Sequence, residues 1–303
     1  MQHAYLTQPE YLPFLQAEFS DFQIFDQATL LSTQRIQPLF AVDVWHDCEI
    51  LHFESIKNAA DLLKERGRLW YHYGHKAFRR GELIGEQIRL LKTKALNFGT
   101  LPPLTPFGIY TLIDEHTLLL CKAPQKPIPL GQLEFIENKN IPPNRAYLKL
   151  WETFTLLRQF PTAGQTCIDV GASPGGWSWV LGECGAQVIA IDKAPLAPHI
   201  ASHPNIQFQQ GSAFALDPKD FDPIDWFCSD IICYPKRLVS LIERWLDSGK
   251  VRHMICTIKL QGDTDWDSIR TLQAIPGATV QHLWHNKHEL CFYTQHDAGN
   301  LAL

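Results

Sequence analysis

The feature that most constrains the fold is the stretch "CIDVGASPGGWSWVLGECGAQVIAID" at residues 167–192. An apolar segment of strand type ends at a turn with three glycines and a proline. A helix-like segment follows, and a second apolar strand stops at Asp192. This order is typical of the first βαβ unit of a nucleotide-binding domain, so we expect a ligand beyond the carboxyl ends of parallel strands.

The second half of the chain continues to alternate apolar strand-like runs with helix-like segments. These runs lack the period-two alternation of a strand with one wet face, which indicates a sheet covered on both faces. We therefore predict an α/β protein in which residues 144–297 form a Rossmann-like domain with a doubly wound, mostly parallel sheet.

The first half mixes short strand-like runs with helices, as in a smaller α+β domain, which we place at residues 1–125. The segment "SIKNAADLLKERG" has a serine N-cap, helical spacing and a glycine stop. A second helix is expected over 81–99, although it contains internal glycines. The stretch "IYTLIDEHTLLLCKAP" predicts a hairpin, and a proline-punctuated linker follows at residues 126–143.

Composition excludes several classes of protein. With 45% apolar and 19% charged residues, the 303-residue chain can bury a real core. It has no apolar run long enough to span a bilayer, and its start lacks the features of a secretion signal, so we expect a cytoplasmic protein with no membrane partner. The eight cysteines and thirteen histidines show no metal-ligand spacing, which predicts free thiols and no metal.

A basic stretch at residues 61–94 departs from the net charge of −5, because it holds nine basic and four acidic residues. Aromatic residues lie within it, so contacts to RNA phosphates and bases are one interpretation. On the residues of the stretch alone, a solvated pair of helices is the favoured interpretation. The candidate RNA-binding residues are Lys76, Arg79, Arg80, Arg89 and Lys92.

The glycine turn reads G-A-S-P-G-G and departs from the dinucleotide fingerprint G-x-G-x-x-G. Asp169 places a carboxylate at the strand end, which repels a pyrophosphate but suits an ammonium or sulfonium group. Asp192 has the position of an acidic residue that binds ribose hydroxyls. S-adenosylmethionine fits both carboxylates, whereas Pro174 and Asp169 disfavour an NAD-dependent enzyme.

The stretch "DVGASPGGWSWVL" resembles the first motif of the FtsJ-like ribose 2'-O-methyltransferases. The resemblance implies an S-adenosylmethionine-dependent methyltransferase. A serine, Ser212, stands where the family usually has an aspartate near the adenine. The cofactor-binding residues that it implies are Asp169, Gly171, Ser173, Pro174, Gly175, Gly176, Trp177, Asp192, Ser212 and Asp230.

The same resemblance implies a catalytic tetrad of Lys149, Asp230, Lys259 and Glu289, which occur in family order. Lys259 is then the general base for a ribose 2'-hydroxyl in an in-line methyl transfer. We expect burial and the second ammonium of Lys149 to lower the Lys259 pKa from its ordinary value of about 10.4. Asp230 would hold Lys259, and Glu289 would fix both lysines.

Within this superfamily, "PIPLGQLEFIENKNIPPNRAYLKLWE" and "LWHNKHELCFY" are most similar to the RlmM type, which modifies a cytidine ribose of bacterial 23S rRNA. That type carries an N-terminal RNA-binding region ending in a THUMP module, and the first 125 residues are short for a complete one. The implied partner is 23S rRNA or a large-subunit precursor. The alternative is a non-catalytic RNA-binding or ribosome-assembly protein with the same fold.

Overall fold

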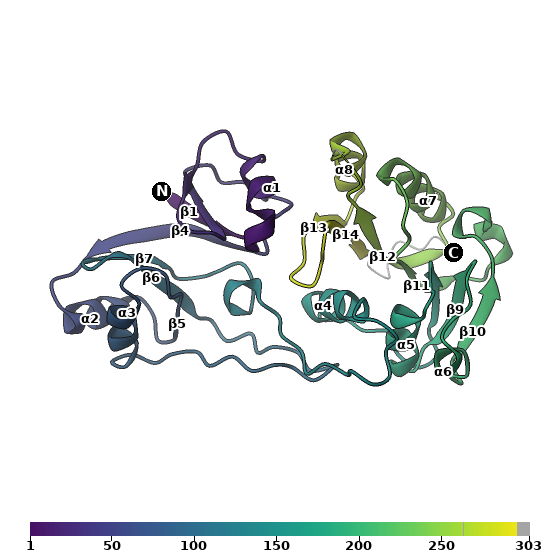
Figure 1. Cartoon of the computed structure of the whole chain (residues 1–303), viewed down its shortest axis with the longest axis horizontal. Helices are drawn as coiled ribbons and strands as arrows, with labels where there is room; N and C mark the ends of the chain where they lie inside the picture. The colour runs from purple at the N-terminus through teal and green to yellow at the C-terminus, as the bar shows by residue number, and fades with distance from the viewer. Residues whose placement is uncertain (263, 296–303) are drawn as a thin grey trace. The chain divides into compact units, whose positions relative to one another are not determined.

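The computed structural model describes residues 1–262 and 264–295 and divides the chain into two compact units (Figure 1). The N-terminal unit comprises residues 1–96 and 101–134, and the C-terminal unit comprises residues 97–100 and those from 135 onward. The division between 134 and 135 falls inside the segment expected as a linker. The end of the expected methyltransferase domain, residues 296 and 297, lies outside the described residues.

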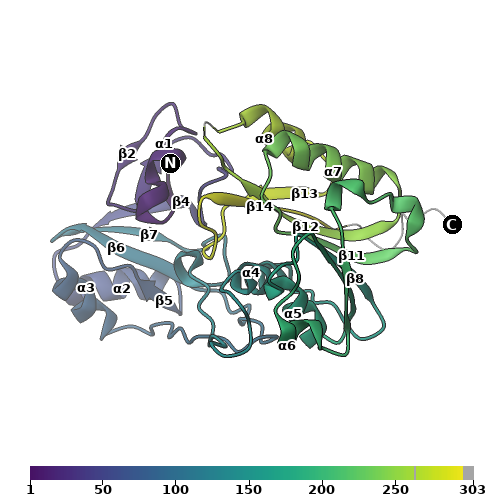
Figure 2. The ribbon, with the colours of Figure 1, turned by 45° about the vertical axis from the view of Figure 1, so that its right-hand side comes forward.

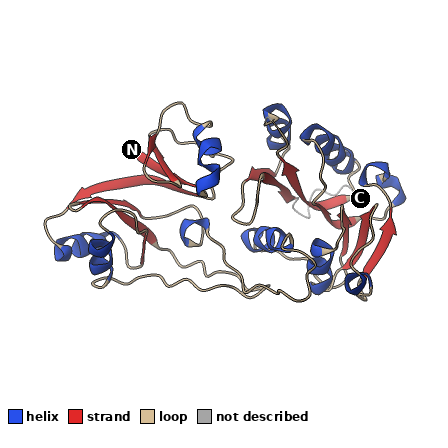
Figure 3. Cartoon of the chain, viewed as in Figure 1, coloured by secondary structure: helices blue, strands red, loops and turns tan. Residues whose placement is uncertain are grey.

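The N-terminal unit is built on a seven-stranded sheet of order β2-β3-β1-β4-β7-β6-β5. Figure 3 draws its strands in red and its helices in blue. Its neighbouring strands are antiparallel except for the parallel pair β5 and β6. The elements are β1 (Gln2–Leu6), α1 (Leu12–Gln16), β2 (Gln23–Ile24), β3 (Thr29–Ser32), β4 (Asp43–His52), α2 (Ile56–Arg66), β5 (Trp70–His72), α3 (Phe78–Gly85), β6 (Gly108–Asp114) and β7 (Thr117–Cys121).

Helix α2 forms as its sequence predicted, because the Ser55 hydroxyl accepts the Asn58 N–H at 3.1 Å as an N-cap. The side chain of Leu63 on α2 and that of Ile84 on α3 pack with Trp70 of the sheet in one apolar core. The expected hairpin is also present, as the antiparallel pair β6 and β7.

The helix expected over residues 81–99 is wrong in extent, since α3 ends at Gly85. The chain then returns to the sheet edge: Trp70 donates its N–H to Arg89 O at 3.0 Å, and Leu91 donates to Trp70 O at 2.7 Å. These bonds to β5 compete with helix continuation. The helix propensity of the segment could not show that its backbone pairs with Trp70, which lies outside the segment.

The C-terminal unit has a second seven-stranded sheet, of order β10-β9-β8-β11-β12-β14-β13, in which only β14 runs antiparallel to its neighbours. The expected doubly wound, mostly parallel sheet is confirmed. The elements are α4 (Tyr147–Leu157), β8 (Thr166–Val170), α5 (Gly176–Glu183), β9 (Gln187–Asp192), α6 (Pro198–Ala201), β10 (Ile206–Gln210), β11 (Ile224–Ser229), α7 (Pro235–Asp247), β12 (Val251–Lys259), α8 (Trp266–Gln273), β13 (Ala278–Gln281) and β14 (Glu289–Gln295).

Helices cover both faces of this sheet, with α4, α5 and α6 on one side and α7 and α8 on the other (Figures 1 and 2). Fully buried aromatic rings fill the space between the layers, among them Phe154 of α4, Trp226 of β11 and Trp245 of α7. The apolar runs without alternation are therefore strands with two packed faces. Within the described residues, no helix is long and apolar enough to cross a membrane, and all eight cysteines are free.

Candidate active site

Four charged side chains meet at the carboxyl edge of the parallel strands. Lys149 lies in the first turn of α4, Asp230 directly follows β11, and Lys259 is the last residue of β12. Glu289 is the first residue of the antiparallel β14 and pairs in register with Lys259. The structure thus brings together all four members of the expected tetrad, although they are spread over 141 positions of the sequence.

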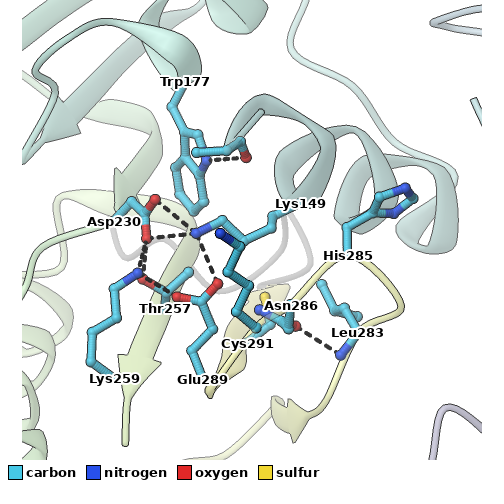
Figure 4. Close-up of polar contacts among 12 residues, drawn as sticks. Lys149, Trp177, Asp230, Thr257, Lys259, Leu283, His285, Asn286, Glu289 and Cys291 are labelled. Atoms are coloured by element: carbon cyan, nitrogen blue, oxygen red, sulfur yellow. Dashed lines mark hydrogen bonds and ion pairs between the residues drawn. The ribbon is translucent and has the colours of Figure 1, made fainter. Parts of the chain in front are cut away.

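The four side chains form a closed ring in which each lysine contacts both carboxylates (Figure 4). Lys149 Nζ lies 2.9 and 2.8 Å from the two carboxylate oxygens of Asp230 and 2.9 Å from Glu289 Oε1. Lys259 Nζ lies 2.6 Å from Asp230 Oδ1 and also donates to Glu289 Oε2. None of the four side chains is more than 18% exposed, so solvent screens these contacts only weakly.

The charges of this ring correct one expectation, because the pKa of Lys259 is raised and not lowered. Burial acts to lower this pKa, but the negative charges of Asp230 and Glu289 and their hydrogen bonds outweigh it. Burial likewise acts to raise the pKa of Glu289, yet the two ammonium groups bring it down to about 2. The ammonium of Lys149 alone would lower the Lys259 pKa, but the two carboxylates outweigh that effect.

Thr257 is a member of the site that the sequence reasoning missed. It lies two positions before Lys259 on β12, and alternate residues of a strand share a face. Its hydroxyl donates to Asp230 Oδ1 at 2.6 Å, and the residue is 1% exposed. Asp230 Oδ1 therefore accepts from Thr257 and from both lysines, which fixes the carboxylate between them.

Glu152, one helical turn after Lys149, is a second residue that the sequence reasoning missed. Its buried carboxylate accepts the backbone N–H groups of Trp284 and His285 and the ring Nδ1–H of His285, each at 2.8 Å. In the same loop, Asn286 Oδ1 accepts the N–H of Leu283 at 2.7 Å (Figure 4). Helix α4 thus holds the loop that leads into Glu289.

A cavity of about 340 Å³ lies beside the glycine turn. Gly171 adopts φ +76° there, and a Cβ on it would approach the Ile231 side chain to 2.9 Å, so both the backbone and the space favour glycine. Four of the expected cofactor-binding residues line this cavity, together with Phe214 and Arg237, which were not foreseen. The four are Gly171, Ser173, Asp192 and Ser212.

Asp192, one of these four, also braces the turn. One oxygen of its carboxylate accepts the Ser173 N–H at 3.0 Å, and the other accepts the Ala194 N–H at 2.9 Å. Each carboxylate oxygen has a second lone pair, so hydroxyl groups of a ligand could still bind there.

Asp169 is fully buried at the end of β8, where its Oδ2 accepts the Ser178 hydroxyl at 2.6 Å. Its Oδ1 is also buried, and no donor among the described residues reaches it. Burial, aided by the negative charges of Asp230 and Asp192, raises the Asp169 pKa to about 7. A positively charged or N–H-bearing ligand would relieve this desolvated carboxylate.

The remaining expected cofactor-binding residues lie elsewhere. Pro174, Gly175 and Gly176 form the turn into α5, where a Cβ on Gly176 would approach Asn144 Oδ1 to 2.5 Å. Trp177 is 3% exposed, and its indole N–H donates to Ala146 O at 2.9 Å on the α4 side. It is not among the residues that line the cavity, and the centre of its ring lies 5.9 Å from Lys149 Nζ.

The expected RNA-binding residues lie in and around α3 of the N-terminal unit. Four of them are exposed, namely Lys76, Arg79, Arg89 and Lys92. Arg80 differs, because it is half-buried with its guanidinium 5.4 Å from the centre of the Phe53 ring. Across the described ranges, no group of three or more histidine, cysteine or acidic side chains is arranged to hold a metal ion.

Comparison with known proteins agrees with this geometry. Residues 142–275 match the FtsJ-like methyltransferase family. The ribosomal RNA large subunit methyltransferase M of Halorhodospira halophila is 33% identical over 165 residues, which cover 52% of this chain and 48% of the relative. The Xylella fastidiosa protein of the same name is 34% identical over 203 residues, which cover 62% of this chain and 57% of the relative. The chain spans about half the length of the curated relatives that it matches.

Proposed function

We propose that the chain methylates ribose 2'-hydroxyl groups of large-subunit ribosomal RNA, because residues 142–275 match the FtsJ-like methyltransferase family. The methyl donor is S-adenosylmethionine. The observation that carries the proposal is the closed ring of two lysines and two carboxylates at the strand ends. The names of the relatives, ribosomal RNA large subunit methyltransferases, support the class of substrate.

The residues around the glycine turn fit a nucleoside cofactor that carries positive charge. The cavity provides glycine backbone and the Asp192 carboxylate for the ribose, and Ser212 and Phe214 for the remainder of the nucleoside. The orphaned Oδ1 of Asp169 and the carboxylate of Asp230 supply negative charge nearby. When bound, S-adenosylmethionine supplies an activated methyl group on a sulfonium.

The ring would remove the proton of the 2'-hydroxyl, which is a weak nucleophile until that proton is accepted. Lys259 holds a proton in the free protein, since Asp230 and Glu289 raise its pKa. Additional positive charge beside Asp230 would compete for that carboxylate and lower the Lys259 pKa toward the range of a base. Once Lys259 has released its own proton to solvent, the neutral amine accepts the hydroxyl proton, and the two carboxylates stabilise the ammonium that results.

Lys149 has a separate role in this mechanism. Three oxygen contacts from two carboxylates hold its ammonium, so it acts as a fixed cation and hydrogen-bond donor for the ribose. The ring contributes alignment as much as proton transfer, because a bound nucleophile held in line with the methyl group reacts as in a unimolecular step.

Methyl transfer by the purified protein tests this proposal. Large-subunit rRNA is incubated with isotopically labelled S-adenosylmethionine, and the digested nucleosides are identified by mass spectrometry. We expect label in a 2'-O-methylated nucleoside with the wild type, and a rate of labelling lower by a factor on the order of 10² to 10⁴ with Lys259→Ala. RNA that is bound but never labelled would indicate the non-catalytic assembly protein. Label on a base would overturn the ribose assignment while leaving a methyltransferase.

A further inference from the structure

The loop that follows Asp230 exposes two large apolar side chains. Ile232 is 78% exposed and Tyr234 is 69% exposed, the highest values for large apolar side chains in the described part of the C-terminal unit. Single exposed apolar residues are common on proteins. Two of them separated by one residue, directly after a member of the charged ring, indicate a binding surface.

This loop lies between the cavity and the charged ring. Ile231 and Ile232 line the cavity beside the glycine turn. On the other side, Asp230 directly precedes Ile231 in the chain and accepts from Lys259 Nζ at 2.6 Å. A group bound on the loop would therefore be next to Lys259.

Exposed cations continue the same segment into the first turn of α7. Lys236 and Arg237 are both exposed. The guanidinium carbon of Arg237 lies 3.6 Å from the centre of the Phe214 ring, in a cation–π contact. The segment 232–237 thus presents an apolar side chain, an aromatic ring and two cations in succession. Proteins bind unpaired nucleotides with this combination, stacking bases on rings and holding phosphates with cations.

We propose that residues 232–237 bind the acceptor nucleotide, with Tyr234 stacking on an unpaired base at or beside the methylated ribose and Lys236 contacting a phosphate. This inference rests on the proposed function and names the site by which the RNA reaches Lys259. The substrate is accordingly a single-stranded or unstacked nucleotide, because the face of the Tyr234 ring replaces a neighbouring base.

The position of the segment favours RNA over a protein partner. A 2'-hydroxyl that gives its proton to Lys259 must come within hydrogen-bond reach of Nζ, so the attached base must lie close to this edge of the sheet. A protein docked on Ile232 would cover residues that also line the cavity. The two exposed cations complement phosphate charge in addition.

The test compares Tyr234→Ala, Tyr234→Phe and the control Ile141→Ala, which removes another exposed apolar side chain of the same unit. The measured quantity is kcat/KM for methyl transfer to a large-subunit rRNA transcript, with calorimetry of S-adenosylmethionine binding alongside. We expect Tyr234→Ala to lower kcat/KM roughly 5- to 100-fold, as for loss of one stacked base. Tyr234→Phe and Ile141→Ala should match the wild type, and cofactor affinity should not change.

The possible outcomes separate this inference from the proposed function. A wild type that transfers no methyl group to RNA overturns the proposed function and the inference with it. An active wild type with an equally active Tyr234→Ala overturns the inference alone. If Tyr234→Phe is as impaired as Tyr234→Ala, the hydroxyl and not the ring face makes the contact, and stacking is rejected.

Discussion

Lys259, the base of the proposed reaction, carries its proton in the free protein. Its ammonium contacts two carboxylates, and these raise its pKa against the effect of burial. The Asp230 carboxylate that does most to hold the proton also accepts from Thr257, so its position is fixed from three directions. The protonation state of Lys259 therefore depends on the balance between the two positive and two negative charges of the ring.

Replacing Lys259 tests its role directly. In Lys259→Ala, we expect methyl transfer to fall by a factor on the order of 10² to 10⁴, the usual contribution of a general base. Binding of S-adenosylmethionine should stay near the wild-type affinity, because Lys259 is not among the residues that line the cavity. Single-turnover rates and calorimetry measure the two effects. Normal turnover by this variant would remove Lys259 from the mechanism.

The pH dependence of the rate follows from the direction of the Lys259 pKa. Since that pKa is raised in the free protein, the neutral fraction of Lys259 is small at pH 7. The value of kcat/KM at limiting S-adenosylmethionine, which reports the free protein, should therefore rise about tenfold per pH unit until the pKa is reached. Glu289→Gln removes one of the two negative charges, lowers the Lys259 pKa and moves the profile to lower pH.

The control for the pH profile is Glu243→Gln, which removes an exposed carboxylate from α7 and should leave the profile unchanged. A Glu289→Gln profile that coincides with the wild type, or lies at higher pH, contradicts the charge balance described for the ring. A lower plateau rate alone does not, because the position of the profile on the pH axis is the readout.

At the scale of elements, the ends of strands and the first turn of α4 bring the ring together. The resemblance in the sequence predicted which four residues belong to it, and each of them lies at the edge of an element. It could not predict the hydrogen bonds by which Glu152 holds the loop before Glu289, here called the Glu152 clamp. The partners of Glu152 lie 132 and 133 positions away in the sequence. Charge balance also depends on distances, which is why the expected direction of the Lys259 pKa was wrong.

Removing the Glu152 clamp should loosen the loop at residues 282–288. Glu152→Ala leaves two backbone N–H groups and one ring N–H without their acceptor, which costs about 3 kcal/mol of unfolding free energy. Amide exchange should accelerate in this loop and not in α8, and methyl transfer should fall because Glu289 follows the loop. Unfolding in urea and hydrogen exchange measure these changes. Unchanged exchange at Trp284 and His285 would refute the clamp.

The sequence predicted the C-terminal unit more completely than the N-terminal unit, for a physical reason. Strands buried on both faces give unbroken apolar runs, as in "TCIDV" and "VRHMICTIK" of β8 and β12. Residues 81–99 give no such signal, because their pairing with β5 depends on two backbone hydrogen bonds to Trp70. Helical spacing in that segment reflects the burial of Ile84 on α3 and not a longer helix.

For the whole molecule, the proposed function assigns a different task to each of the two units. The C-terminal unit holds the charged ring and the cavity. The N-terminal unit carries the exposed cations of the basic stretch, in a chain whose net charge is −5. An enzyme acting on a folded RNA needs such phosphate contacts, because phosphates dominate affinity while the active site selects the ribose.

Charge reversal in the N-terminal unit tests this division. Combining Arg79→Glu, Arg89→Glu and Lys92→Glu should weaken RNA binding and reduce its dependence on salt, without changing S-adenosylmethionine affinity. Arg80 is left in place because it packs on Phe53. The control Lys219→Glu reverses an exposed cation that precedes β11. It lies at the amino ends of the parallel strands, whereas the charged ring lies at their carboxyl ends. Equal RNA affinity for the triple variant and the control would remove the basic stretch from the RNA-binding surface.

Ribose methylation of large-subunit rRNA can be measured in cells. The measurement is mass spectrometric mapping of 2'-O-methylated nucleotides in rRNA from cells that lack the gene, complemented with the wild type or with Lys259→Ala. We predict that one ribose methylation disappears without the gene, returns with the wild type and stays absent with Lys259→Ala. An unchanged methylation map in cells that lack the gene would contradict the account.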